Sequence, residues 1–262
     1  MATLSLAKIA ARKTFSQNAV PLALHKALAH IFFACAEGLW LVGGTALAGF
    51  YAEHRRSDDL DLFAQDQFAW QAAVRAVQSL KEKGAVFSHE RTASGYFRTL
   101  AKLDQHEFTI DLVLDEHLFQ VGKANKSEEN ILFADISTLL AMKVACLVSR
   151  ASEKDLFDLD WILGRIPKWE IAELIELGKQ FDGGLNVESM LISLQGSILR
   201  KEACAFILPK SQLTAEEVYK LITALRQKFI QRLLVYEKNQ AASPEIQTLE
   251  KSFKQQKRFV KK

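Results

Sequence analysis

The sequence predicts an α+β fold in which a half built on a mixed β-sheet precedes a helical half. Segments with the short apolar runs or two-residue alternation typical of strands are confined to residues 39–114. After Gly122 the apolar residues follow helical spacing almost throughout. Of the 262 residues, 49% are hydrophobic and 25% are charged, so the chain can bury a sizeable core and its composition argues against widespread disorder.

The individual elements follow from apolar spacing, capping residues and turn residues. Strands are predicted at Leu39–Val42, Asp59–Phe63, Ala85–Glu90, Tyr96–Leu103 and Glu107–Leu114, with a hairpin turn around Gln105 between the last two. Helices are predicted at residues 4–13, 21–37, 45–52, 67–83, 135–150, 152–163 and 214–238. Thr214 and Glu217 have the spacing of a capping box for the last of these helices.

The change of pattern after the last predicted strand places a domain boundary near residues 125–134. We expect an α/β core with N-terminal helices over residues 1–130 and a helical region over residues 131–262. No acidic residue precedes Glu37, a composition that also occurs in transit peptides. Because helical spacing runs unbroken through the second predicted helix, a basic helical extension of the domain is the preferred interpretation.

Charge and cysteine content exclude some classes of protein. The net charge is +3, so bulk charge does not by itself indicate a nucleic-acid partner. Cys35, Cys146 and Cys204 are widely spaced and form no CxxC pair, which favours buried reduced thiols in a cytoplasmic protein over a disulfide framework or a zinc site. No segment has the apolar length needed to span a bilayer, so no membrane partner is expected.

Two aspartates mark the second predicted strand. Asp59 and Asp61 are two residues apart and therefore project from the same face, while Leu60 and Leu62 face a core. Two adjacent carboxylates repel each other unless a cation lies between them, and Mg²⁺ prefers such hard oxygen ligands. The alternative is a solvated turn that includes Asp58, and the Asp-x-Asp pattern alone does not distinguish the two.

The segment before this strand favours the first interpretation. Gly43, Gly44 and Thr45 end a strand and begin a helix. Glycines at that point let backbone amides approach phosphates, and a helix N-terminus attracts anions. The order of strand, Gly-Gly-Thr, short helix and strand with Asp-x-Asp predicts a metal-dependent site for a nucleoside triphosphate.

A lysine on an apolar helix face supports the same site. Lys143 lies on the stripe formed by Leu139 and Leu147 in the helix predicted at 135–150. A lysine in that position must extend to solvent or meet an anion. Asp155 and Asp158 share a face of the next helix through their three-residue spacing, although a charge at Asp155 also suits the positive end of the helix.

The segment LVGGTALAGFYAEHRRSDDLDLF (41–63) resembles the first motif of the nucleotidyltransferase superfamily. More narrowly, it resembles the AbiEii/AbiGii toxin family of bacterial abortive-infection and toxin–antitoxin systems, to which the MenT toxins are related. The resemblance continues through residues 96–163 and so covers roughly residues 39–163. It implies a mixed-sheet nucleotidyltransferase core flanked by helices.

The resemblance also implies roles for individual residues. Asp59 and Asp61 would bind Mg²⁺, or Mn²⁺, as catalytic residues, and Gly43, Gly44 and Thr45 would cradle phosphate. Lys143 lies in a segment similar to the third motif and would contact nucleotide phosphates. Asp155 and Asp158 lie in a segment similar to the fourth motif, where Asp158 is the preferred catalytic residue and Asp155 would act beside Lys143 in nucleotide binding.

A third carboxylate and a basic residue complete the expected site. In the superfamily a carboxylate lies on the strand beside the Asp-x-Asp strand, and Asp111 is the candidate for catalysis and metal binding. An ordinary surface aspartate is an equal alternative, and Asp155 or Asp158 could supply the third carboxylate instead. Arg98 could clamp phosphates, or it could pair with a side chain on a neighbouring strand.

Two further basic segments are candidates for phosphate or RNA contact. His54, Arg55 and Arg56 precede the Asp-x-Asp strand, where a solvated loop position is expected for at least one of them. The tail at residues 251–262 has six basic residues with two interleaved phenylalanines, which suits phosphate contacts, although a solubilising tail is the more common meaning of such a run.

The expected activity is transfer of a nucleoside monophosphate from a nucleoside triphosphate to an acceptor hydroxyl. By resemblance the acceptor is the 3′ end of a tRNA, which would make the protein a toxin with a cognate antitoxin. The alternatives are a transferase acting on an aminoglycoside-like small molecule or a protein, and a non-catalytic module that binds nucleotide or RNA. Fold and motif do not decide the acceptor.

Overall fold

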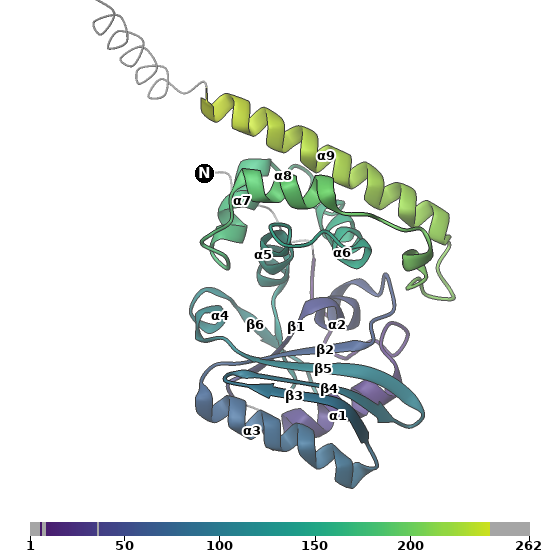
Figure 1. Cartoon of the computed structure of the whole chain (residues 1–262). Coiled ribbons are helices and arrows are strands. Elements are labelled where there is room, and N and C mark those ends of the chain that lie inside the picture. The colour runs from purple at the N-terminus through teal and green to yellow at the C-terminus, as the bar shows by residue number, and fades with distance from the viewer. Residues whose placement is uncertain (1–5, 7–8, 36, 242–262) are drawn as a thin grey trace, which may run out of the picture.

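One mixed sheet runs through the lower half of the molecule (Figure 1). The computed structural model describes residues 6, 9–35 and 37–241. Within them, seven strands pair in the order β3-β4-β5-β2-β1-β7-β6. The strands are β1 (Leu39–Val42), β2 (Asp59–Ala64), β3 (Val86–Ala93), β4 (Tyr96–Leu103), β5 (His106–Leu114), β6 (Ala124–Lys126) and β7 (Leu132–Ala134).

Parallel and antiparallel pairs occur together in this sheet, as the sequence predicted for a mixed sheet. β2 is parallel to β5, and β1 is parallel to β7, whereas β1 and β2 are antiparallel. The remaining pairs, β3 with β4, β4 with β5 and β6 with β7, are antiparallel. In the strand order, β5 and β2 lie next to each other near the middle of the sheet, and they form one of its two parallel pairs.

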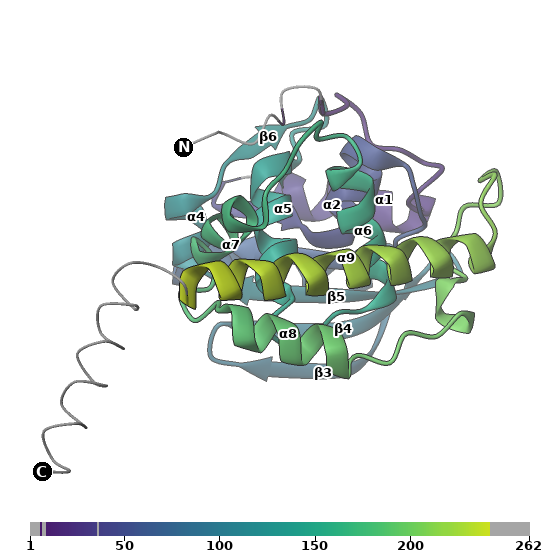
Figure 2. The ribbon, with the colours of Figure 1, turned by 90° about the horizontal axis from the view of Figure 1, so that it is seen from above.

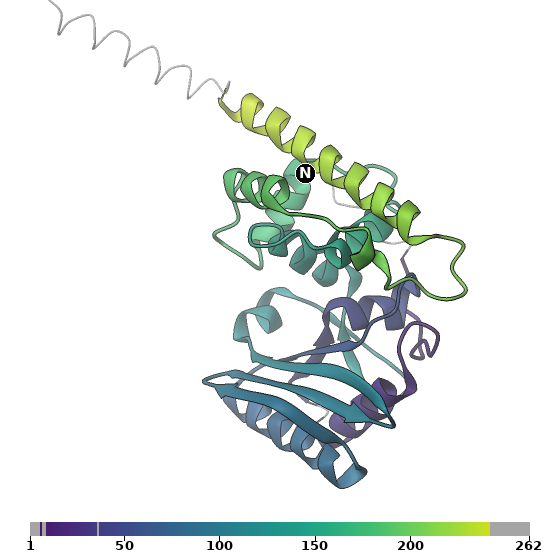
Figure 3. The same cartoon turned by 45° about the vertical axis from the view of Figure 1, so that its right-hand side comes forward.

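Helices cover both faces of the sheet. They are α1 (Leu22–Ala34), α2 (Gly43–Leu47), α3 (Gln67–Gln78), α4 (Glu116–Val121), α5 (Ile136–Cys146), α6 (Glu153–Leu163), α7 (Ile171–Lys179), α8 (Val187–Gly196) and α9 (Ala215–Ala241). Short non-α turns are η1 (Ala48–Ala52), η2 (Ser79–Lys83) and η3 (Glu202–Cys204). Figure 3 shows α1 and α3 on the side of the sheet away from α5–α9.

The alternation of β2 sorts its side chains between these two layers. Leu60, Leu62 and Ala64 are fully buried toward the α1–α3 side, and Asp59 and Asp61 face the opposite side. On that opposite side α2 packs against β2, α5 and α6. Seen from above in Figure 2, α9 runs across the whole helical layer. The carboxylates thus lie between the sheet and the helices.

Several sequence predictions are confirmed by local detail. The β4–β5 hairpin turns at Asp104 and Gln105, whose φ angles of +49° and +63° suit the right-handed twist of the flanking strands. Asp135 and Ser152 cap α5 and α6 through hydrogen bonds from backbone amides. Thr214 forms the expected capping box with Glu217.

Other predictions need correction. Residues 6 and 9–13, the described part of the predicted helix 4–13, are not helical. This segment is instead fixed by a hydrogen bond from the Arg12 amide to the Phe50 carbonyl. The short elements α4, β6 and β7 were not predicted, because three to six residues are too few to show a period. The basic tail 251–262 lies outside the described residues.

Two further features concern membrane-spanning helices and the cysteines. No helix among the described residues is long and apolar enough to cross a membrane. All three cysteines are free thiols, with Cys35 and Cys204 buried and Cys146 half-buried.

Candidate active site

Three aspartates meet at the centre of the sheet. In the parallel pairing of β2 with β5, Asp59 lies beside Thr109 and Asp61 lies beside Asp111. All four side chains share one face because residues two apart on a strand point the same way. Strand register therefore brings Asp111 to the Asp59–Asp61 pair from a distant part of the chain.

These residues line a cavity of about 230 Å³ between the sheet and the helices. Its wall consists almost wholly of polar and charged side chains. The lining residues are Gly44, Arg55, Ser57, Asp59, Asp61, Arg98, Thr109, Asp111, Lys143, Arg150, Ser152, Lys154 and Asp155. Four carboxylates and five cationic groups face one another there, which is an environment suited to a metal-bound polyphosphate.

The two glycines make room for charged side chains. A Cβ on Gly43 would lie 2.0 Å from Oδ2 of Asp61, and the φ of +67° at Gly43 also disfavours any other residue. A Cβ on Gly44 would lie 2.2 Å from an Nη of Arg55. The glycine pair thus allows β1 and α2 to pack directly against Asp61 and Arg55.

Thr45, which the resemblance assigns to phosphate binding, lies buried beside the cavity rather than in its wall. Its side chain is completely buried and hydrogen-bonds to the Ser57 hydroxyl at 2.9 Å and to the Asp59 carbonyl. It does not line the cavity. Thr45 fixes the start of β2 and thereby the position of Asp59, while phosphate contact by this residue stays a prediction.

The pKa values of Asp59 and Asp61 are shifted in opposite directions. Burial raises the pKa of Asp59, but the hydrogen bond from Thr109 and the charge of Lys154, 3.3 Å away, lower it by more, so the net shift is downward. Burial and the neighbouring charge of Asp59 raise the pKa of Asp61 to about 6. Asp61 is therefore the carboxylate whose charge most lacks compensation by protein groups.

Asp111 has partners on one oxygen. Its Oδ1 accepts a hydrogen bond from the Tyr96 hydroxyl at 2.7 Å and from Nη1 of Arg98 at 3.4 Å. Arg98 is the register partner of Asp111 across β4 and β5. Arg98 therefore pairs across strands, as one of the two interpretations has it, and it also lines the cavity, while phosphate contact stays a prediction.

Behind the cavity lies a buried ion network centred on Asp158. Arg55 donates two hydrogen bonds to its carboxylate, at 2.6 and 2.9 Å, and Nζ of Lys143 lies 2.8 Å from Oδ2. His54 contacts Oδ1 through Nε2 at 2.8 Å. Burial raises the pKa of Asp158, but Arg55 and Lys143 hold it well below its ordinary value.

Asp155 joins this network to the cavity wall. Lys143 donates to its Oδ1 at 2.7 Å, and the Ser152 hydroxyl donates to Oδ2 at 2.6 Å. Arg150 lies 3.2 Å from the same carboxylate. Burial lowers the pKa of Lys143, but the charges of Asp158 and Asp155 outweigh it and raise the value, so the lysine is firmly cationic. The position of Lys143 on an apolar helix face predicted that it meets an anion. The protein itself provides this anion, in the carboxylates of Asp155 and Asp158.

The structure brings most of the predicted site residues together. The cavity contains Gly44, Asp59, Asp61, Arg98, Asp111, Lys143 and Asp155. Gly43 and Thr45 lie beneath it as packing positions. Asp158, predicted as catalytic, has no exposed surface and does not line the cavity. Its contacts make it a positioning residue for Arg55 and Lys143.

Some lining residues were not singled out by the sequence. Thr109 lies two residues before Asp111, so strand alternation places it on the same face as Asp111. Arg150 and Lys154 also line the cavity, on either side of Ser152, the N-cap of α6. Of the basic trio before β2, Arg56 is exposed, as expected for one member, whereas the Arg55 side chain is 3% exposed.

The donor set fits a hard divalent cation. The three carboxylates on β2 and β5 offer only oxygen ligands, and burial together with the charge of Asp59 raises the pKa of Asp61, so a cation beside Asp61 would be favourable. Among the described residues no group of three metal-ligating side chains converges closely enough to form a complete site. Mg²⁺ commonly takes its remaining ligands from waters and substrate phosphates.

A mixed sheet with paired carboxylates facing a cationic helical wall is the arrangement expected of a nucleotidyltransferase. The chain belongs to the family described as "Nucleotidyl transferase AbiEii toxin, Type IV TA system", whose sequence model matches residues 26–253. This match extends well past residue 163, where the motif resemblance ended, and includes the helical region.

Two solved structures are similar to this chain over most of its length. JHP933 from Helicobacter pylori shares 17% identity at a TM-score of 0.47, covering 85% of this chain and 97% of that one. The nucleotidyltransferase toxin MenT4, Rv2826c, from Mycobacterium tuberculosis H37Rv shares 14% identity at a TM-score of 0.47, covering 79% and 85%. The comparison with curated proteins gives no match.

Proposed function

We propose that this chain transfers a nucleoside monophosphate from a nucleoside triphosphate to an acceptor hydroxyl. The observation that carries the proposal is the register of Asp61 beside Asp111, with Asp59 on the same face and five cationic side chains around them. Membership of the toxin family supports the class of reaction. In the proposed step the acceptor oxygen bonds to the α-phosphorus, the bond to the β-phosphate breaks, and pyrophosphate leaves.

In this proposal the three carboxylates have different roles. Asp59 and Asp61 would hold Mg²⁺ or Mn²⁺, which when bound neutralises charge on the phosphates. Asp111 has its Oδ1 engaged by Tyr96 and Arg98. Its Oδ2 is the atom that we assign to accept the proton of the attacking hydroxyl.

The cations bind the triphosphate from two sides, Arg150, Lys154 and Lys143 from the helical layer and Arg98 from β4. Arg150, Lys154 and Arg98 are partly exposed, with side-chain exposures of 66%, 43% and 47%, so they can turn toward phosphate oxygens. Lys143 is held from beneath by Asp155 and Asp158 and adds fixed positive charge. Such a wall stabilises the negative charge of both the bound triphosphate and the leaving pyrophosphate.

The acceptor proposed from the family resemblance is the 3′ end of a tRNA, so that the modified tRNA would no longer support translation. The test is incubation with each of four nucleoside triphosphates labelled in the α-phosphate, with Mg²⁺ and total tRNA. Parallel reactions contain an aminoglycoside or a protein extract as the acceptor. Label in tRNA supports the full proposal, whereas label only in another acceptor keeps the chemistry and replaces the acceptor.

If the chain is a toxin of this kind, we expect it to arrest growth and to have a neutralising antitoxin. Induced expression of the wild-type chain is expected to arrest bacterial growth, and Asp61→Asn is expected not to. An antitoxin encoded beside it is expected to restore growth. Normal growth at verified expression of soluble wild-type protein would refute the toxin proposal, while the labelling reaction tests the chemistry independently.

A further inference from the structure

One row of register partners extends from the catalytic carboxylates onto the outer strands of the sheet. The row consists of Asp61 on β2, Asp111 on β5, Arg98 on β4 and Arg91 on β3. Register partners on neighbouring strands point to the same face, and neighbouring strands are about 4.8 Å apart. The backbone of Arg91 is therefore roughly 10 Å from that of Asp111, and both side chains are on the catalytic face.

The two outer strands, β3 and β4, are open on this face. On the catalytic side α2 packs against β1 and β2. Every residue of β3 is exposed except the half-buried Phe87, and the side chains of β4 that share the face of Arg98 are exposed or half-buried. Figure 2 shows β3, the last strand of the sheet, at the margin of the molecule. This face therefore offers an open approach to Asp111.

A β-bulge turns Arg91 toward the catalytic face. Ser88 and Arg91 are three residues apart, so in a regular strand they would point to opposite faces. The register shifts between them, where His89 has a φ of +56°. As a result Ser88 lies opposite Leu100 and Arg91 lies opposite Arg98, two positions on the same face of β4. Bulges that redirect a side chain in this way are common next to active sites.

The same bulge directs the acidic neighbour of Arg91 to the other side of the sheet. Glu90 accepts hydrogen bonds from Gln78 at 2.6 Å and from Lys81 at 3.0 Å. These two residues belong to α3 and to η2, which follows it, on the side away from α5–α9. The catalytic face thus receives the arginine of this segment without the adjacent glutamate.

Three exposed cations lie on the open face, namely Arg91, Arg98 and Lys102. Arg91 and Arg98 are directly opposite each other, and like charges in that arrangement are destabilising unless an anion lies between them. Asp111 partly balances Arg98, at 3.4 Å, and Glu107 is the register partner of Lys102. Among the described residues no carboxylate forms an ion pair with Arg91, so its charge is the least balanced of the three.

We propose that this open face of β3 and β4 is the docking surface for the acceptor RNA, with Arg91 and Lys102 contacting phosphates next to its 3′ end. The inference rests on the proposed function, because it takes RNA as the acceptor, and it adds where that RNA binds. Arginine has a planar donor fork that fits phosphate, and RNA carries a phosphate at every nucleotide.

The direction of the transfer step agrees with this surface. In-line transfer requires the attacking oxygen to lie opposite the leaving pyrophosphate. Three of the four cations assigned to the triphosphate come from the helical layer, whereas Asp111, the assigned base, lies between the carboxylates of β2 and the open face. An RNA strand lying over β3 and β4 therefore presents its terminal hydroxyl to that base.

The first measurement is equilibrium binding of fluorescent total tRNA to the full-length protein, followed by anisotropy with chelator and without nucleoside triphosphate. Arg91→Ala should weaken binding about threefold to tenfold and should reduce the slope of log affinity against log salt by about one. Lys102→Ala should weaken it less, because Glu107 partly balances that charge, and the double variant should lose the most. Both side chains are exposed, so the variants should fold as wild type does.

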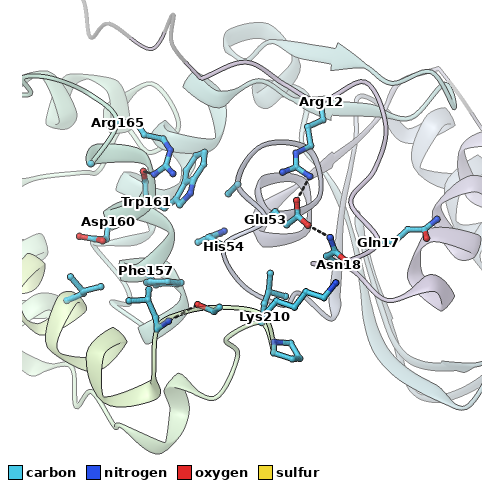
Figure 4. A pocket seen from close by; sticks show the side chains of 17 residues that line it. Arg12, Gln17, Asn18, Glu53, His54, Phe157, Asp160, Trp161, Arg165 and Lys210 are labelled. Atoms are coloured by element: carbon cyan, nitrogen blue, oxygen red, sulfur yellow. Dashed lines mark hydrogen bonds and ion pairs between the residues drawn. The ribbon is translucent and has the colours of Figure 1, made fainter.

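Two control variants remove cations of the same types elsewhere. Arg75→Ala removes an exposed arginine of α3, which covers the opposite side of the sheet (Figure 3). Lys210→Ala removes an exposed lysine at a separate cavity of about 770 Å³, shown in Figure 4, which shares no lining residue with the catalytic cavity. Both controls should bind tRNA as wild type does, since neither residue lies on the open face.

The second measurement separates binding of the acceptor from binding of the nucleotide. In steady-state transfer of α label to tRNA, Arg91→Ala and the double variant should raise the KM for tRNA by a factor close to their loss of affinity. The KM for nucleoside triphosphate should stay that of wild type, because neither Arg91 nor Lys102 lines the catalytic cavity.

Failure of the docking surface differs from failure of the proposed function. Transfer of label to no acceptor would refute the function, while weaker tRNA binding by Arg91→Ala would still support the surface. Transfer to tRNA, with wild-type binding and wild-type KM in the double variant, would overturn the surface and leave the function standing. Absence of tRNA binding by wild type, or an equal loss in Arg75→Ala or Lys210→Ala, would also overturn the surface.

Discussion

Asp61 on β2 and Asp111 on β5 lie side by side as register partners of two parallel strands. Neighbouring strands are about 4.8 Å apart, so the two carboxylates are close in a half-buried setting where like charges are costly. Asp59 adds a third negative charge on the same face. The protein maintains this arrangement although it destabilises the fold, which is expected where binding of a cation or substrate offsets the cost.

The first prediction concerns the stability of Asp61→Asn without metal. The pKa of Asp61 is raised from 3.8 to about 6 in the folded state, so ionisation destabilises the fold as pH rises above about 4 and does so fully above pH 6. The variant should therefore be more stable than wild type at pH 7, by at most about 3 kcal/mol, and equal to it near pH 4. Chemical denaturation at both pH values, with chelator present, measures this.

Added Mg²⁺ should reverse that difference. Metal bound to the folded state stabilises wild type by mass action, and the neutral amide of the Asp61→Asn variant would bind it poorly. A wild-type protein that is more stable than Asp61→Asn in chelator at pH 7 would show that the Asp61 charge is already compensated.

The second prediction concerns the buried carboxylate of Asp158. Asp158→Asn leaves the Arg55 and Lys143 charges without their main partner and should cost about 3–5 kcal/mol of unfolding free energy at pH 7. Because the folded pKa is depressed, this stabilisation is present above about pH 4 and is lost as pH falls through the folded value. The difference in unfolding free energy between the two proteins should therefore narrow as the pH falls below about 4.

Asp160→Asn is the matched control for this variant. Asp160 lies on the same helix, and burial raises its pKa, so loss of its charge should cost little or even stabilise. If Asp158→Asn and Asp160→Asn lose the same unfolding free energy, the ion network around Asp158 makes no specific contribution to stability.

The third prediction separates crowding from backbone strain at a glycine. Gly43→Ala places a methyl 2.0 Å from Oδ2 of Asp61, whereas Gly84→Ala has the same unfavourable sign of φ with nothing within 4 Å. Both should lose roughly 1–2 kcal/mol from the left-handed backbone. Only Gly43→Ala should lose transferase activity, and activity that survives in it would argue against the observed position of Asp61.

The fourth prediction concerns the phosphate-binding cations. Arg150→Ala and Lys154→Ala remove partly exposed side chains, so unfolding free energy should change by less than about 1 kcal/mol. The KM for nucleoside triphosphate should rise about tenfold, because each cation is assigned to phosphate. Steady-state kinetics on the folded variants checks this. The control is Lys168→Ala, because Lys168 is 84% exposed and does not line the catalytic cavity. An unchanged KM in both would remove these residues from the nucleotide site.

Much of the site could be predicted because it depends on short periods. The two-residue alternation of β2 selects Asp59 and Asp61, and the helical stripe of α5 selects Lys143, whereas Asp111 was predicted from the family resemblance. Such periods do not show which strands pair with each other or in which register. That Asp111 lies beside Asp61 follows from the parallel register of β2 and β5, which only the folded sheet shows.

The role of Asp158 could not be predicted for the same reason. Its partners His54 and Arg55 are more than 100 residues away in the chain, and nothing in their local pattern indicates the pairing. The three-residue strands β6 and β7 are too short to show alternation.

The most direct test of the central claim follows the fate of the two ends of the triphosphate. Wild type and Asp61→Asn are incubated with Mg²⁺, total tRNA and nucleoside triphosphate labelled in either the α- or the γ-phosphate. We expect wild type to transfer the α label and release the γ label as pyrophosphate, and the folded Asp61→Asn to do neither. Transfer of the γ label, or equal α transfer by Asp61→Asn, would contradict nucleotidyl transfer at the Asp59–Asp61–Asp111 site.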